Sequence, residues 1–113
     1  MNLKHGVDTT GVCPQIWYAA GVCKQLFTDR NYAFTITSMR DGVHSPHSKH
    51  YSGEAFDMRT RHLPPGVRSE LFAKIKSVLD PLGFDTVDEH DTKRHWHCEW
   101  DPKPGEKWLT YAP

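Results

Sequence analysis

The chain has 113 residues, with 14 Lys and Arg against 14 Asp and Glu, so its formal net charge is zero. This length favours a single domain over residues 1–113 with one modest core. The balanced charge offers no basic excess for binding nucleic acid, and no apolar run approaches the roughly 18 to 20 residues of a membrane span. Its three cysteines are expected to remain reduced thiols.

The first half of the chain contains one clear helical pattern and two strand-like runs. Residues 1–12 show no periodicity, so we expect an extended arm. Residues 32–37 and 54–59 are expected to be strands, joined through a loop over residues 41–53 that contains Gly, Pro and Ser. A helix is expected over residues 14–30, where apolar side chains recur at helical spacing: Ile16, Ala19, Ala20, Cys23, Leu26 and Phe27.

The second half begins with another helix, expected over residues 65–79 because its apolar side chains form one stripe: Val67, Leu71, Phe72, Ile75, Val78 and Leu79. Residues 84–88 and 95–100 are expected to be strands, separated by a polar turn over residues 89–94. The tail beyond Asp101 is expected to pack back onto the domain through Trp108, Leu109 and Tyr111.

These elements predict an α+β domain, with a small antiparallel sheet of about four strands and helices packed on one side. Hairpin geometry would pair residues 84–88 with residues 95–100. The second of these strands could then lie beside residues 54–59.

Five of the eight histidines fall in two short stretches: His44, His47, His50, His95 and His97. Gly53, between His50 and Asp57, lets the chain turn back so that both side chains can reach one ion. Catalytic zinc sites use three protein ligands, often His and Asp or Glu, and leave one position to water. We therefore predict a zinc site that contains His50, Asp57 and a histidine of the second stretch.

Residues 95–100 alternate between two kinds of side chain. In a strand, His95, His97 and Glu99 lie on one face, and two tryptophans and a cysteine lie on the opposite, core-facing side. Either histidine could supply the third ligand. A zinc hydrolase also needs a base that accepts a proton from the attacking water. The candidate groups are Asp91, Glu89, His95 and Glu99.

The pattern Ser48-x-His50-x-x-Gly53-x-Ala55-x-Asp57, followed by His95-x-His97, resembles the zinc peptidases grouped as lysostaphin, D-alanyl-D-alanine peptidase and sonic hedgehog relatives. The likeness is greatest to the D-Ala-D-Ala carboxypeptidase branch, which also contains phage endolysins that cut the L-alanyl-D-glutamate bond of peptidoglycan. The resemblance extends over residues 35–101 and implies a fold of the hedgehog and D-Ala-D-Ala peptidase type.

Position by position, the resemblance implies that His50, Asp57 and His97 are the zinc ligands. It implies that Arg40, upstream of the motif, binds or polarises the substrate. Ser48, the first residue of the motif, is implied as a second substrate-binding residue.

The catalytic base is the point at which this chain departs from the common pattern. Many relatives place a carboxylate three residues before the last ligand, where this chain has Arg94. The spacing of Asp91 from His95 instead resembles the hedgehog-like arrangement. It implies Asp91 as the base, with Glu89 as the alternative, and His95 as a proton donor or oxyanion stabiliser.

We therefore expect a zinc peptidase that cleaves peptidoglycan stem peptides, as an L-Ala-D-Glu endopeptidase or a D-Ala-D-Ala carboxypeptidase. The alternative is a non-catalytic, hedgehog-like zinc-binding module. The N-terminal residues lack the apolar core of a secretion signal. We accordingly expect a protein that is made in the cytoplasm and acts on the cell wall, as phage lysis or virion enzymes do. We also expect it to be a monomer.

Overall fold

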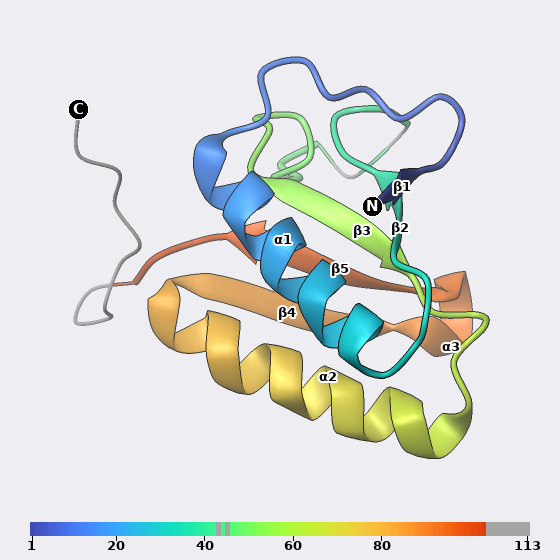
Figure 1. The fold of residues 1–113 in the computed structure, drawn as a ribbon. Coiled ribbons are helices and arrows are strands. Elements are labelled where there is room, and N and C mark those ends of the chain that lie inside the picture. Colours follow the sequence, from blue (N-terminus) through green and yellow to red (C-terminus); the bar gives the residue numbers. More distant parts are fainter. Residues whose placement is uncertain (43, 45, 104–113) are drawn as a thin grey trace.

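A computed structural model describes residues 1–42, 44 and 46–103 of the chain (Figure 1). Two long helices, α1 (Pro14–Asp29) and α2 (Pro65–Leu79), cover one face of the sheet. Within the described residues the sheet has five strands, in the order β1-β2-β3-β5-β4. Their bounds are β1 (Asn2–Leu3), β2 (Thr35–Ser38), β3 (Ala55–Arg59), β4 (Phe84–Glu89) and β5 (His95–Trp100). The predicted α+β class is confirmed.

Two short helices complete the described chain. A 3-10 helix, η1 (Asp80–Leu82), directly follows α2, and α3 (His90–Lys93) connects β4 to β5. No helix among residues 1–42, 44 and 46–103 is both long enough and apolar enough to cross a membrane. The predicted packing of Trp108, Leu109 and Tyr111 concerns a tail that lies outside the described residues.

The sheet is mixed, so the prediction of an antiparallel sheet was wrong at one edge. β1 pairs in parallel with β2, because the N–H of Asn2 donates to Phe34 O at 3.0 Å and the N–H of Lys4 donates to Ile36 O at 2.9 Å. The other three pairings are antiparallel. The expected arm over residues 1–12 therefore supplies a short edge strand. Two residues carry no side-chain periodicity from which such a strand could be predicted.

Two other boundaries differ from expectation for local reasons. The strand expected over residues 32–37 begins only at Thr35, because Asn31 takes a positive φ of 64° and the Tyr32 N–H donates back to the end of α1. The turn expected over residues 89–94 contains one turn of helix, α3, which Arg94 ends with a φ of 57°. The backbone thus reverses between β4 and β5 within very few residues.

The predicted hairpin of β4 and β5 and the neighbouring position of β3 are both confirmed. In this register Asp57 of β3 lies opposite His97 of β5. His95 lies opposite Arg59 on one side and Glu89 on the other. Three adjacent strands therefore bring residues far apart in sequence onto one face of the sheet.

The hydrophobic core lies between the sheet and the two long helices. Strand alternation sends Phe56 and Met58 of β3, and Trp96 and Cys98 of β5, into this core, where each is fully buried. Fully burying an apolar side chain of this size contributes roughly 1.5–3 kcal/mol. Because these residues face the helices, the residues between them face the opposite side of the sheet.

Candidate metal centre

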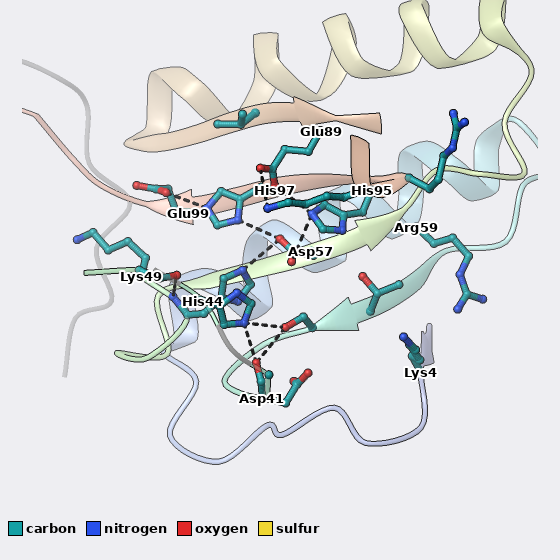
Figure 2. Close-up of a pocket in the computed structure, with 18 of the residues that line it drawn as sticks. Lys4, Asp41, His44, Lys49, Asp57, Arg59, Glu89, His95, His97 and Glu99 are labelled. Carbon is teal, nitrogen blue, oxygen red and sulfur yellow. Dashed lines mark hydrogen bonds and ion pairs between the residues drawn. The ribbon is translucent and has the colours of Figure 1, made fainter. Parts of the chain in front are cut away.

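The face of the sheet opposite the core forms the floor of a cavity of about 880 Å³ (Figure 2). Asp57 projects into it from β3, and His95, His97 and Glu99 project from β5. The loop between β2 and β3 brings His50 to the same place. The division of β5 into a polar and an apolar face, predicted from its alternation, is therefore confirmed.

His50, Asp57 and His97 converge on one point. Asp57 Oδ1 lies 3.1 Å from His50 Nε2 and 2.9 Å from His97 Nδ1. One ligand atom from each of the three residues falls within 4.8 Å of the other two, so the group could hold a metal ion. His50 and Asp57 are only 2% and 3% exposed, which keeps water from competing for these atoms.

The loop that carries His50 is held by its own turn and by the N-terminal segment. The N–H of His50 donates to Ser48 Oγ at 3.2 Å, and the N–H of Gly53 donates to His50 O at 3.1 Å. Gly53 has a φ of +73°, and a Cβ at this position would lie 2.3 Å from Gly11 O. A glycine is required here for both reasons. Its carbonyl in turn accepts the N–H of Cys13 at 3.0 Å.

The outer nitrogens of both histidine rings are held by acceptors. His50 Nδ1 bonds to Met39 O, and His97 Nε2 bonds to Glu99 Oε1 at 2.8 Å. These oxygens can only accept, so the outer nitrogens carry the hydrogens. If the rings are neutral, the inner nitrogens, His50 Nε2 and His97 Nδ1, each carry a lone pair that faces Asp57 Oδ1. Three electron-pair donors can converge in this way only around a cation or added protons.

The donor set at this point fits zinc. Two imidazoles and a carboxylate are the ligands of a common class of catalytic zinc site. Outer hydrogen bonds from a ligating histidine to a backbone carbonyl or a carboxylate fix its tautomer and ring orientation. Met39 and Glu99 supply such partners to His50 and His97. The chemistry of the residues therefore agrees with the predicted cofactor.

The electrostatics keep the central carboxyl ionised. Burial raises the pKa of Asp57, but hydrogen bonds with His50 and His97 outweigh it and hold that pKa below its usual value. Burial lowers the pKa of His97, while its hydrogen bonds with Asp57 and Glu99 outweigh that effect and raise the pKa above the ordinary value. Asp57 is therefore anionic at neutral pH, as a ligand must be.

His95 and Glu89 lie beside this group. His95 Nε2 is 3.0 Å from Glu89 Oε1 and 3.6 Å from Asp57 Oδ2. Both residues line the cavity, and Figure 2 shows them next to Asp57. Of the four base candidates, Glu89 and His95 thus form a pair within the cavity, whereas Glu99 bonds to His97.

Asp91 and Arg40 are not brought to the cavity. Asp91 is exposed in α3 and does not line the cavity, because one turn of helix directs it away from the end of β4. Arg40 also lies outside the cavity lining. Its Nη1 donates to Thr10 O at 3.0 Å, so this side chain holds the N-terminal segment. Ser48 does line the cavity, where it also fixes the backbone of His50.

Two further features were not predicted from the sequence. His44 stacks on His50, with ring centroids 4.0 Å apart and planes 9° apart, and so covers one side of the ligand ring. A group of basic residues, called here the basic rim, also lines the cavity: Lys4, Arg59, Arg61, Lys93 and Arg94. One sequence signal could have indicated the basic rim: Arg59 lies two residues after Asp57, so on a strand the two side chains share a face.

No protein-family model, no curated protein and no solved structure matches this chain. What the fold and the site define is an α+β domain with a candidate metal centre formed by His50, Asp57 and His97. Membership of the zinc peptidase superfamily stays a prediction from the sequence motif.

Proposed function

We propose that this chain is a zinc-dependent peptidase that acts on peptidoglycan stem peptides. The observation that carries the proposal is the convergence of His50 Nε2, Asp57 Oδ1 and His97 Nδ1 beside the Glu89–His95 pair, at the floor of an open cavity. Three ligands with an acid and a histidine next to them are the parts that a hydrolytic zinc site requires.

His50, Asp57 and His97 would hold the metal. Bound there, zinc would supply a Lewis acid for the scissile carbonyl and lower the pKa of a coordinated water toward about 7. The protein contributes the geometry: Met39 O orients His50, and Glu99 orients His97. A structural site would instead be closed by four ligands, commonly thiolates. Two of the cysteines, Cys23 of α1 and Cys98 of β5, are fully buried in the core, away from this face.

We assign Glu89 as the base in place of Asp91. Glu89 Oε1 lies at the cavity and within hydrogen-bonding distance of His95 Nε2, so it can accept a proton from a water that attacks the substrate. His95, whose Nε2 also lies 3.6 Å from Asp57 Oδ2, is suited to donate a hydrogen bond to the carbonyl oxygen as negative charge develops there. This assignment keeps the role proposed for His95 from the sequence.

The basic rim supports an anionic peptide as substrate. Lys4, Arg59 and Arg61 line the cavity and have no ion-pair partner among the described residues. Figure 2 shows Arg59 and Lys4 on the side of the cavity beyond His95. Peptidoglycan stem peptides carry free carboxylates, which unpaired arginines bind through two parallel hydrogen bonds. We therefore transfer substrate binding from Arg40 to Arg59 and Arg61.

The test is digestion of purified peptidoglycan by the zinc-loaded protein, with and without a chelator, followed by mass spectrometry of the products. New peptide termini that vanish on chelation are expected. A cut after L-Ala would indicate an endopeptidase, and loss of a terminal D-Ala a carboxypeptidase. Unchanged muropeptides in zinc-replete buffer would contradict the proposal.

The second candidate is a non-catalytic zinc-binding module of the hedgehog-like type. It is favoured by the partners of Glu89, whose Oε2 lies 3.5 Å from Lys93 Nζ while its Oε1 faces His95. A carboxylate engaged on both oxygens is a weaker proton acceptor. This candidate requires one zinc per chain with no hydrolysis, and a Glu89→Gln variant that keeps full binding of its ligand.

A further inference from the structure

The two carboxylate oxygens of Asp57 face different histidines. Oδ1 is directed at His50 and His97, at 3.1 and 2.9 Å. Oδ2 is the oxygen nearer His95, 3.6 Å from its Nε2. A carboxylate in this orientation can offer one oxygen to each of two ions, because each oxygen has its own lone pairs.

Glu89 completes a group on the Oδ2 side. Its Oε1 lies 3.0 Å from His95 Nε2, and the two residues are directly opposite each other in the β4–β5 ladder. One ligand atom each from Asp57, Glu89 and His95 falls within 4.8 Å of the others. The side chains of His95 and Glu89 are 16% and 28% exposed, so the group opens toward the cavity and toward water.

We propose that Asp57, Glu89 and His95 form a second divalent-cation site, with Asp57 bridging the two ions. Hydrolytic sites with two metals place them about 3.5–4 Å apart, a separation that one bridging carboxylate spans. One imidazole and two carboxylates are a harder donor set than that of the first site. Such a set accepts Mn²⁺ as well as Zn²⁺.

The charges around the second site make it the weaker of the two. Lys93 Nζ lies 3.5 Å from Glu89 Oε2, and Arg59, Arg61, Arg94 and Lys4 line the same cavity. The side chain of Lys93 is 60% exposed, so it can move into solvent when an ion takes its place. Repulsion between two divalent ions about 4 Å apart lowers the affinity further, so the second ion binds at least about tenfold more weakly than the first.

The consequence for activity rests on the proposed function. A cation on Glu89 and His95 occupies the groups assigned to proton transfer and to the developing oxyanion. The second ion therefore inhibits hydrolysis, and the protein works with one ion bound. An excess of divalent metal switches it off.

The test separates the two sites by metal. The protein is loaded with one equivalent of Zn²⁺, verified by atomic absorption, and titrated with Mn²⁺ while the electron paramagnetic resonance signal of free Mn²⁺ is recorded. Zn²⁺ is silent in this measurement, and Mn²⁺ does not displace it because Mn²⁺ stands lowest in the affinity series. One Mn²⁺ per zinc-loaded chain is expected, and hydrolysis should fall as that ion binds.

The variants Glu89→Gln and His95→Asn should each lose the bound Mn²⁺ and keep the zinc. The matched controls, Glu70→Gln on α2 and His5→Asn near the N-terminus, change exposed residues away from the cavity lining and should keep both ions. Absence of bound Mn²⁺ in the zinc-loaded protein, or equal Mn²⁺ binding in Glu89→Gln, would overturn the second site while leaving the proposed peptidase intact. Failure of the first zinc to bind would overturn both.

Discussion

The backbone carbonyl of Met39 accepts a hydrogen bond from Nδ1 of His50, eleven residues further along the chain. This contact assigns the proton of the His50 ring to its outer nitrogen and turns the Nε2 lone pair toward Asp57. The bond joins the end of β2 to the loop that carries the motif. The ligand is therefore oriented by the backbone of the sheet as well as by its own loop.

Metal binding should stabilise the fold. Zinc at 1,000 times its dissociation constant adds about 4 kcal/mol to the free energy of unfolding. We expect the melting temperature of the wild type to rise on addition of zinc, and that of Asp57→Asn to stay unchanged. Differential scanning fluorimetry with and without zinc measures this. An equal rise in both proteins would mean that the ion binds elsewhere.

Glu89 and Asp91 can be separated by paired amide substitutions. Glu89→Gln should lower kcat by about 10²–10⁴-fold, the usual contribution of a general base. Asp91→Asn should leave kcat unchanged, since Asp91 is exposed in α3 and outside the cavity lining. Both variants should bind one zinc, which checks that they fold. The reverse pattern of rates would restore Asp91 as the base.

Removal of the carboxylate behind His97 should weaken the metal site without removing a ligand. Glu99→Gln should reduce zinc affinity by about 10–100-fold, as for other outer-shell partners of ligating histidines. Glu54→Gln is the control, because Glu54 lies outside the cavity lining, where it bonds to Ser52 and lies 3.9 Å from Lys49 Nζ. Competition with a chromophoric chelator measures both affinities. Equal affinities in the two variants would refute the orienting role of Glu99.

Gly53→Ala should be destabilising, by more than about 1 kcal/mol, because its positive φ disfavours alanine. The new Cβ would also meet Gly11 O at 2.3 Å. Gly66→Ala is the matched control: Gly66 lies in α2 with nothing within 4 Å of an added Cβ, and alanine is the better helix former. The urea midpoint should fall below that of the wild type in Gly53→Ala and rise above it in Gly66→Ala.

The thiols should react slowly while the protein is folded. Burial raises the pKa of the Cys23 and Cys98 thiols, and burial also raises that of the half-buried Cys13. The thiolate is the reactive form, so a raised pKa lowers the reactive fraction at a given pH. A disulfide reagent at pH 8 should label Cys13 first, and all three thiols only after unfolding. Rapid labelling of Cys98 in the folded protein would contradict its burial.

The parts of the fold that could be predicted from sequence are those with local periodicity. The apolar stripe of α2 and the alternating polar and apolar residues of β5 each indicate which side of the element faces the core. The sequence pattern left His95 and His97 both open as partners of Asp57, and only the resemblance of the motif implied His97, which the register of β3 and β5 places opposite Asp57. β1 carried no such signal, since its hydrogen bonds join residues more than thirty positions apart.

The site was harder to predict where short backbone features decide direction. Asp91 follows Glu89 by only two positions, yet β4 ends at Glu89 and α3 begins immediately afterwards. The first carboxylate therefore lies opposite His95 and the second faces solvent. Arg40 similarly follows β2, where its side chain reaches Thr10 of the N-terminal segment. The spacing of these residues in the sequence does not tell which of their side chains point into the cavity and which point away.

The segment that ends at Cys13 is joined to both ends of the loop region: Arg40, directly after β2, donates to Thr10 O, and the N–H of Cys13 donates to Gly53 O inside the loop. Residues 1–13 thus contribute no ligand but support the loop that carries His50. A tag, truncation or proteolytic cut in this segment would free the loop that carries His50. Metal binding would then have to order the loop as well, and the entropy lost in doing so would lower the metal affinity. Preparations that differ only at their first dozen residues should accordingly differ in how readily they retain metal.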